Sequence, residues 1–433
     1  MIYLQLFRYL VPLVFTMIAQ EFSGQVLNGG MARMPRATET LAGYGLAVGL
    51  VTFLTSPLLQ ARQLGLVLVE SRPEFRRVLA FVLLSGALLA AILACLALTP
   101  LGTWVIEGWH DAPPPLAAVA REALLWLAPM PILRSLFLFY SGLLMRIRRT
   151  DVVSYAILAG IGASIAAVFA LLPAGFVRER PIRLPLLVTY AGIAADLSIV
   201  LWGYQRYVRR TLGETDGGQS LRYVFRFYWP LALVMAIQGF SRPLINLFVS
   251  RGTDGAEALA VLTVVYSLAH LPYGWVNEIR SLPVAFKDRE NSLAAIRRFA
   301  LGCGLLSFGV MLVLFWTPLR TVILESWIGV EAELAAPAAM PLRVFTFFPL
   351  TVMVRAYLHG IGLLEHRTKA LAPSAPARIA AILIALVILS AFPMHGATRA
   401  ILALFCGFAA EMLVVWRSVQ GGRYGRREYL ARI

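Results

Sequence analysis

Long apolar stretches alternate with short polar segments along the whole chain. A helix needs about 20 apolar residues to cross a membrane, and twelve stretches approach or exceed that length. They cover roughly residues 7–29, 41–69, 78–99, 122–145, 152–173, 184–205, 225–249, 257–286, 299–319, 338–364, 370–392 and 396–416. The pattern therefore predicts an all-α polytopic membrane protein with twelve transmembrane helices.

The composition supports this class. The chain of 433 residues is 59% hydrophobic and 14% charged, with a mean hydropathy of +0.74, whereas soluble proteins carry about 25% charged residues. No basic segment precedes the first apolar stretch, so we expect it to remain as a helix and not to be cleaved as a signal peptide. Cys95, Cys303 and Cys406 lie far apart in apolar stretches, and their spacing predicts neither a metal site nor a disulfide.

The motifs of common hydrolytic and nucleotide-binding sites are absent from the sequence. We find no Walker A, HExxH, GxSxG or GxGxxG pattern, and these are the patterns that would indicate such chemistry. We therefore expect no catalytic residue, no cofactor and no metal, and no pumping driven by ATP. The net charge of +16 does not indicate nucleic-acid binding, because the basic residues are sorted by side of the membrane.

The chain repeats itself with an offset of 218 residues. The matching pairs include Phe7/Phe225, Pro12/Pro230, Gln20/Gln238, Asn28/Asn246, Arg62/Arg280 and Gly142/Gly360. Such a register indicates two related halves, and because six spans is an even number the halves are parallel repeats. We expect lobes at 1–208 and 223–416, a cytoplasmic linker at 209–222 and a basic cytoplasmic tail at 417–433.

Arginine and lysine are concentrated in the loops of one side. That side holds the clusters at 72–77, 146–149, 206–226, 287–298 and 367–369, and the tail from 417. The other side holds fewer than half as many, at Arg33, Arg36, Arg121, Arg178, Arg180, Arg183, Arg251, Arg320 and Arg399. The positive-inside rule makes the first side cytoplasmic, so we expect both termini inside and the protein in the cell (inner) membrane.

A third group of basic residues lies inside the predicted spans. It consists of Arg62, Arg134, Arg242, Arg280, Arg343, Arg355 and Arg378. A basic residue at the centre of a span costs about 2.5–3.5 kcal/mol on insertion, so these residues need acidic partners, water or an anionic ligand. The acids away from span edges are fewer, namely Glu21, Asp196, Glu278 and Glu411, and the resulting positive interior attracts anions.

The first helix of each half carries a polar stripe. The stripes consist of Gln20, Gly24 and Asn28, with Glu21 and Gln25 alongside, and of Gln238, Arg242 and Asn246, with Ser241 alongside. Residues four apart stack on one helix face. The stripes therefore either line a cavity or form hydrogen bonds between helices.

The eighth span carries a second polar face. His270, Tyr273, Asn277 and Arg280 follow one another at steps of three, four and three residues, which places them on one side of a helix. Arg280 and its repeat mate Arg62 either line a cavity or extend to the cytoplasmic interface.

The remaining charged residues inside the spans could have binding, structural or proton-coupling roles. Arg134 lies near the middle of the fourth span, about a dozen residues from either end, and is the clearest charge inside a span. Arg378 lies near the cytoplasmic end of its span, where a structural role is the alternative. Glu21 and Glu278 either pair with arginines or take up a coupling proton.

Several motifs resemble the progressive ankylosis (ANK) family. They are Ser241-Arg242-Pro243-Leu244-Ile245-Asn246, Pro272-Tyr273-Gly274-Trp275-Val276-Asn277-Glu278-Ile279-Arg280, Pro341-Leu342-Arg343, Val354-Arg355-Ala356 and His395-Gly396-Ala397-Thr398. The resemblance implies a fold like that of the multidrug/oligosaccharidyl-lipid/polysaccharide (MOP) flippases, with two six-helix lobes in a V. It also implies export of small polyanions, namely citrate, nucleoside triphosphates and inorganic pyrophosphate.

We therefore expect an alternating-access transporter, and not an enzyme, that exports small multivalent anions through a basic central cavity. The expected binding residues are Arg62, Arg134, Arg242, Arg280, Arg343, Arg355, Gln25, Asn28, Gln238, Asn246, Tyr273 and Asn277. The expected partners are the anion and the lipid bilayer, and the expected state is a monomer.

Three alternatives use the same observations. A flippase of lipid-linked pyrophosphate oligosaccharides or phospholipids would share the fold and bind a phosphate headgroup in the basic cavity. A drug antiporter that extrudes cations would need acids to dominate the cavity. A structural or signalling membrane protein would leave the arginines inside the spans unexplained.

The repeat preserves the polar scaffold but not the charge. Arg242 falls opposite Gly24, and Arg355 falls opposite Phe137. Because the second half carries more of the basic residues, we expect the anion to lie off the pseudo-axis, toward the C-terminal half.

Overall fold

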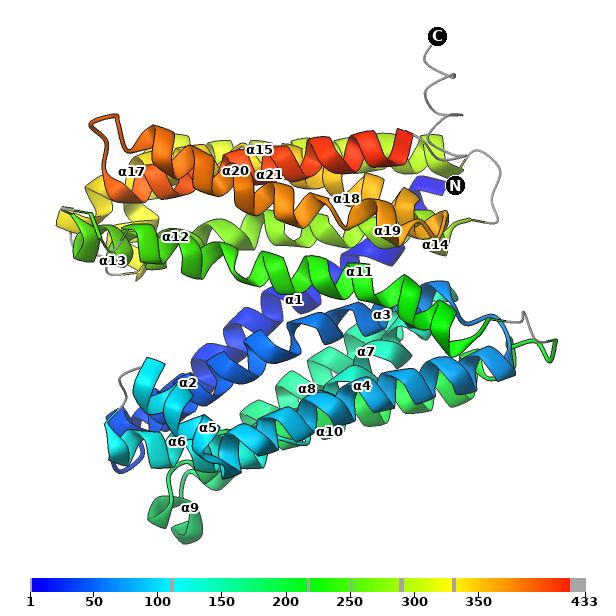
Figure 1. Ribbon diagram of the computed structural model, residues 1–433, viewed down its shortest axis with the longest axis horizontal. Helices are drawn as coiled ribbons and strands as arrows, with labels where there is room; N and C mark the ends of the chain where they lie inside the picture. The colour runs from blue at the N-terminus through cyan, green and yellow to red at the C-terminus, as the bar shows by residue number, and fades with distance from the viewer. Residues whose placement is uncertain are drawn as a thin grey trace. The chain divides into compact units, whose positions relative to one another are not determined.

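The chain forms two helical units in the computed structural model (Figure 1). The structure describes residues 2–109, 113–215, 219–249, 251–252, 254–287, 292–328 and 332–420. One unit is Tyr9–Tyr228, and the other consists of the chain from Trp229 onward together with the first residues up to Arg8. We call them the N-terminal and the C-terminal unit.

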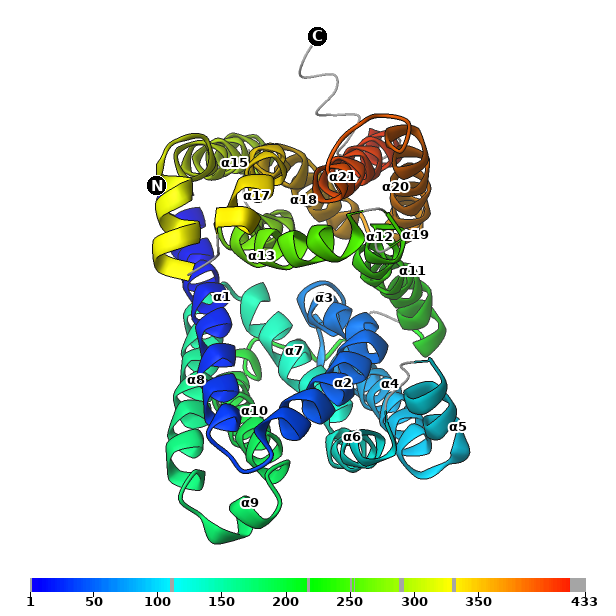
Figure 2. The ribbon, with the colours of Figure 1, turned by 90° about the vertical axis from the view of Figure 1, so that its left-hand side faces the viewer.

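The N-terminal unit is built from long helices joined by short irregular segments. Its elements are α1 (Ile2–Ala32), α2 (Ala37–Thr55), the 3-10 helix η1 (Ser56–Gln60), α3 (Ala61–Val67), α4 (Arg72–Leu98), α5 (Pro100–Thr103), the π-helix η2 (Trp104–Trp109), α6 (Pro114–Leu127), α7 (Met130–Arg146), α8 (Thr150–Leu171), α9 (Gly175–Glu179), α10 (Arg183–Gly203) and the π-helix η3 (Tyr204–Val208). In Figure 2 α8 lies beside α10 and α2 beside α6, and both pairs are packed together.

The C-terminal unit has a similar succession of elements and begins within α11, whose residues up to Tyr228 belong to the N-terminal unit. It contains α11 (Leu221–Gly239), α12 (Ser241–Val249), α13 (Gly255–Tyr273), the 3-10 helix η4 (Gly274–Ser281), α14 (Leu282–Ala285), α15 (Ser292–Trp316), α16 (Leu319–Thr321), the π-helix η5 (Val322–Ile328), α17 (Ala332–Phe345), α18 (Phe348–Leu364), α19 (Thr368–Leu371), α20 (Ser374–Leu389) and α21 (Gly396–Gln420). α20 packs along α21, and α18 packs against both α21 and η4.

The 218-residue offset of the sequence extends to the irregular elements. The 3-10 helices begin at Ser56 and Gly274, and the π-helices η2 and η5 begin at Trp104 and Val322. The helix pairs α6/α17 and α7/α18 begin and end at the same offset. The predicted internal repeat is therefore present in the backbone as well as in the residue pattern.

Two equivalent glycines explain how the broken helices pack. A Cβ atom at Gly142 would collide with the carbonyl group of Arg62, and one at Gly360 would meet the carbonyl group of Arg280. Glycine at these positions lets α7 and α18 approach the backbone of the broken helix closely. The contact fixes the backbone of both arginines.

The start of the predicted linker is attached to the N-terminal unit. Ser71 and Gly213 form a β-bridge, in which Arg72 N donates to the Gly213 carbonyl at 2.9 Å and Gly213 N donates to the Glu70 carbonyl at 3.1 Å. An ion pair of 3.0 Å joins Arg72 to Glu214. We expected a loop between two bundles, and its first part is held in place by these contacts.

Helices long and apolar enough to span a membrane dominate the structure. Among the described residues ten qualify, and the bent pair α6 and α7 makes an eleventh. In the first helix, the described apolar stretch is Ile2–Met17. The predicted all-α membrane class is confirmed, and the predicted fourth span, 122–145, is bent by 44° between α6 and α7.

Candidate functional site

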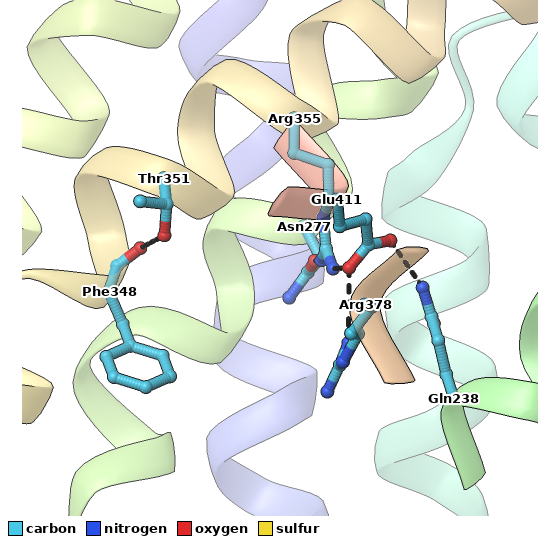
Figure 3. A network of polar contacts seen from close by, with 7 residues as sticks. All are labelled: Gln238, Asn277, Phe348, Thr351, Arg355, Arg378 and Glu411. Atoms are coloured by element: carbon cyan, nitrogen blue, oxygen red, sulfur yellow. Dashed lines mark hydrogen bonds and ion pairs between the residues drawn. The ribbon is translucent and has the colours of Figure 1, made fainter. Parts of the chain in front are cut away.

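A buried carboxylate on α21 joins three helices of the C-terminal unit (Figure 3). Glu411 has no solvent-exposed surface. Its Oε2 atom accepts hydrogen bonds from Arg355 Nη1 at 2.9 Å and Arg378 Nη1 at 3.2 Å, and its Oε1 atom accepts one from Gln238 Nε2. The arginines come from α18 and α20, and Gln238 comes from α11.

Asn277 connects this network to the 3-10 helix η4. Its side-chain oxygen accepts a hydrogen bond from Arg355 Nη2, and its side-chain nitrogen donates to the Gly274 carbonyl at 2.9 Å. A side chain at Gly274 would collide with the His270 imidazole. Glycine at the start of η4 therefore permits the geometry that brings Asn277 to Arg355.

An aromatic cluster lies against the two guanidinium groups. The guanidinium carbons of Arg355 and Arg378 are 5.1 and 4.1 Å from the centroid of the Phe408 ring, and the ring face attracts a cation. Phe408 packs on Phe348 at 5.0 Å, and Phe348 packs on Tyr273 at 5.8 Å. Tyr273 is thus buried in the aromatic cluster.

Two further arginines of the C-terminal unit are electrostatically linked to this network. Arg242 acts on the Tyr273 hydroxyl together with Arg378 and Arg355, and its guanidinium carbon lies 4.6 Å from the centroid of the Tyr266 ring. His359 interacts with Glu411, Arg355 and Arg280. We call Arg242, Arg280, Arg355 and Arg378, together with Glu411, the basic cluster.

The electrostatics of the basic cluster favour an anion. Its single carboxylate faces the two guanidinium groups of Arg355 and Arg378, while Arg242 lies within electrostatic range of Tyr273 and Arg280 within range of His359. Buried charges without compensation are costly. An anion that reaches the cluster would reduce that cost and could accept bidentate hydrogen bonds from arginine.

Other predicted site residues have contacts that do not involve Glu411 or are described only by their burial. Arg343 lies over the Trp316 ring, with its guanidinium carbon 5.5 Å from the centroid. Burial, and then the neighbouring Arg343, lower the pKa of Arg320, which places Arg343 toward that end of the unit. The Oδ1 atom of Asn246 on α12 is buried without a hydrogen-bond partner, and the Glu278 carbonyl accepts a hydrogen bond from Ser281 at 2.6 Å.

Of the site residues predicted on α1, the structure describes the side chain of Asn28 alone. Asn28 is exposed. The side chains of Glu21 and Gln25 lie outside the described part of the chain, so their predicted roles stay predictions.

The N-terminal unit holds its own, looser ion pair. Arg134 Nη1 is 4.0 Å from Asp196 Oδ2, and both residues line a cavity of about 460 Å³. Arg134 also interacts electrostatically with Arg62. The side chain of Arg134 is 38% exposed, against 11% for Arg355, so the N-terminal pair is the more accessible one.

Sequence reasoning missed the partners of the arginines. Glu411 and Asp196 were recognised as acids inside spans but were not paired with particular arginines, because spacing along one helix does not show what faces it from another. Arg378 was considered structural and is part of the network with Glu411. Among the described residues no group of three or more His, Cys, Asp or Glu is arranged to hold a metal ion.

Comparison with known families gives one match over most of the chain. The model of the family described as progressive ankylosis protein (ANKH) matches residues 1–317. The match covers more than half of the chain and includes the whole N-terminal unit.

Comparison with solved structures shows the fold. The MATE transporter ClbM in complex with Rb⁺ aligns with a TM-score of 0.71 and 14% identity, over 100% of this chain and 98% of that chain. A mutant of the Vibrio cholerae MATE transporter VcmN gives 0.71 and 15%, over 97% and 96%. A MOP superfamily transporter from Pyrococcus furiosus, described as having a binding pocket of reverse polarity, gives 0.69 and 15%, over 99% and 96%. The expected similarity to the MOP fold is confirmed.

Proposed function

This chain belongs to the progressive ankylosis protein (ANKH) family, and from that premise we propose that it exports small multivalent anions by alternating access. The family and the fold make it a membrane transporter of the MATE/MOP type. The finer proposal concerns the substrate class, which comprises citrate, pyrophosphate and nucleoside triphosphates.

The observation that carries this proposal is the basic cluster of the C-terminal unit. Arg355 and Arg378 share the carboxylate of Glu411, while Arg242 lies within electrostatic range of Tyr273 and Arg280 within range of His359. A guanidinium group offers a planar pair of donors that fits a carboxylate or a phosphate. A cation would be repelled by this charge, which argues against extrusion of cationic drugs.

Neutral groups would complete the proposed site. Gln238 and Asn277 already contact the network. The side-chain oxygen of Asn246 is buried without a hydrogen-bond partner, and the amide nitrogen of the same side chain could donate to an anion. The sequence-predicted residues of the N-terminal unit, Arg62 and Arg134 among them, would contribute less. We further propose that the protein is a monomer of the cell membrane with both termini in the cytoplasm.

The polarity of a MATE-type pocket is known to vary in at least one similar structure. The Pyrococcus furiosus transporter is described as having a binding pocket of reverse polarity. That description supports the idea that this fold can be adapted to a substrate of another charge.

Flux into proteoliposomes tests the proposal. Labelled citrate, pyrophosphate and ATP would be measured with wild type, with Arg280→Ala and with Arg62→Ala, which alters the repeat-equivalent arginine. We expect flux of at least one anion, reduced at least tenfold by Arg280→Ala and less by Arg62→Ala. Equal flux in wild type and Arg280→Ala would exclude the arginine site, and lipid scrambling without anion flux would favour a flippase.

A further inference from the structure

An apolar groove opens on the N-terminal unit where α6 bends into α7. It has a volume of about 870 Å³. We call it the α6–α10 groove, and its walls include Leu125, Trp126, Pro129, Phe176, Leu187 and Tyr190. Apart from Arg183 at one end, its lining side chains are apolar or aromatic, so a water-soluble anion is not the ligand it fits.

The bend of the helix explains why the groove exists. α6 and α7 meet at 44° around Pro129, and proline lacks the N–H group that would continue the helical hydrogen bonds. The Tyr190 hydroxyl donates to the carbonyl of Trp126 beside the bend. The groove's only side-chain hydroxyl is therefore already used, which leaves an apolar surface for the ligand.

The walls of the groove are exposed on the N-terminal unit and belong to apolar helices long enough to span a membrane. The side chains of Leu125, Trp126 and Phe176 are 42–54% exposed, and α6 and α10 belong to membrane-spanning segments. From Arg183 to Tyr190 the helix rises about 10 Å, so the groove extends from the membrane interface into the hydrocarbon region.

The charged end of the groove fits a phosphate group. Arg183 is the first residue of the 21-residue helix α10, and a helix N-terminus favours an anion. Arg183 Nη1 donates to the Phe176 carbonyl at 3.1 Å, which holds the side chain at the mouth. The nearby Arg180 is 3.9 Å from Glu122, so the Glu122 charge is opposed by Arg180.

We propose that the α6–α10 groove binds one phospholipid with an anionic headgroup. Its phosphate contacts Arg183, and one acyl chain lies along Trp126 and Leu187. The lipid sits in the leaflet of the 174–183 loop, which the distribution of arginine predicts to be the non-cytoplasmic one. This binding is independent of the proposed anion transport.

Native mass spectrometry of the purified full-length protein tests the proposal. Phosphatidylglycerol and phosphatidylcholine would be titrated into wild type, Leu187→Phe, Arg183→Gln and the control Leu88→Phe, which alters an exposed leucine of α4. We expect wild type to bind one phosphatidylglycerol about tenfold more tightly than phosphatidylcholine. Leu187→Phe, which places a larger ring in the groove, should weaken that binding about tenfold, while Arg183→Gln should abolish the headgroup preference and Leu88→Phe should change nothing.

Two results would overturn the proposal. One is equal binding of phosphatidylglycerol to wild type and to Leu187→Phe. The other is displacement of the lipid by glycerol phosphate, which has no acyl chain. A measurement that needs no variant is crosslinking of wild type by phosphatidylglycerol with a photoreactive acyl chain, where label must appear in peptides of α6 or α10, and label confined to other helices contradicts the assignment.

Discussion

At the scale of single residues, Glu411 sets the charge of the C-terminal unit. Its carboxylate is fully buried and accepts hydrogen bonds from two arginines and one glutamine. Removing one member of a buried ionic network costs more than the network contributes as a whole, because the remaining charge is left without a partner. The order in which substitutions destabilise the protein therefore reveals which residue holds the network together.

We predict that Glu411→Gln destabilises the protein more than Arg378→Gln. The first change leaves two buried guanidinium groups without a carboxylate and should cost about 3–5 kcal/mol. The second leaves the pair of Arg355 and Glu411, at 2.9 Å, intact and should cost less. Thermal unfolding in detergent would measure both, and a larger loss for Arg378→Gln would contradict this account of the network.

A second prediction concerns Asp254, at the loop between α12 and α13. The Gly396 N–H group donates to Asp254 Oδ2 at 2.6 Å, and this hydrogen bond, helped by the nearby His395 and Arg399, lowers the pKa of Asp254 below its usual 3.8. A carboxyl group whose pKa is lower in the folded state stabilises that state above the unfolded pKa. Its contribution is lost as the pH falls through the folded pKa.

Asp254→Asn should therefore lower stability at pH 7 and matter less in acid. We expect a loss of about 1 kcal/mol at neutral pH, at the low end for a charged hydrogen bond because the group is partly exposed. Unfolding temperatures of wild type and variant should converge below pH 3.8. A difference that is constant or grows as the pH falls would show that the charge of Asp254 is not responsible.

Several residues of the hydrogen-bond network around Glu411 could be predicted from the sequence, and their partners could not. Arg355, Gln238 and Asn277 were expected at the site because they are polar or charged inside apolar spans, and they do meet at Glu411. Which acid faces which arginine depends on how α18, α20 and α21 pack. The predicted binding roles of these residues stay predictions until a ligand is measured.

At the scale of elements, the repeat includes the irregular 3-10 and π-helical segments as well as the long helices. The apolar pattern predicted the spans, but the 3-10 segments η1 and η4 and the π-helices η2 and η5 carry no periodicity that a hydropathy pattern could reveal. They recur at the same offset as the residues. Local backbone geometry was therefore part of the duplicated unit, and glycine at the close contacts is one physical reason that it persists.

We predict that Gly142→Ala and Gly360→Ala both destabilise the protein. The added methyl group would collide with the carbonyl group of Arg62 or Arg280, and overpacking of this kind costs about 1–3 kcal/mol. Gly302→Ala is the matched control, because a Cβ atom there meets nothing within 4 Å, and alanine favours a helix. If unfolding temperatures of all three variants matched wild type, the close approach of the helices would be refuted.

At the scale of the whole molecule, symmetry of the scaffold contrasts with asymmetry of charge. Each unit pairs an acid on its last long helix with an arginine on its fourth span, as Arg134 with Asp196 and Arg355 with Glu411. The C-terminal unit adds Arg378 to the same carboxylate. The twelve-span pattern and the repeat sufficed to predict the fold class, whereas the substrate depends on a few side chains whose ligand is not encoded in any periodicity.

The most direct test of the central claim is the binding of pyrophosphate to the purified protein, measured by calorimetry. The account predicts saturable binding that Arg280→Ala and Arg242→Ala each weaken at least tenfold, because a lost charged hydrogen bond costs about 1.5–3 kcal/mol, while Arg62→Ala has a smaller effect. Variants would be compared only as folded, monodisperse protein. Equal affinity in wild type and Arg280→Ala, or no binding of pyrophosphate or citrate to wild type, would contradict it.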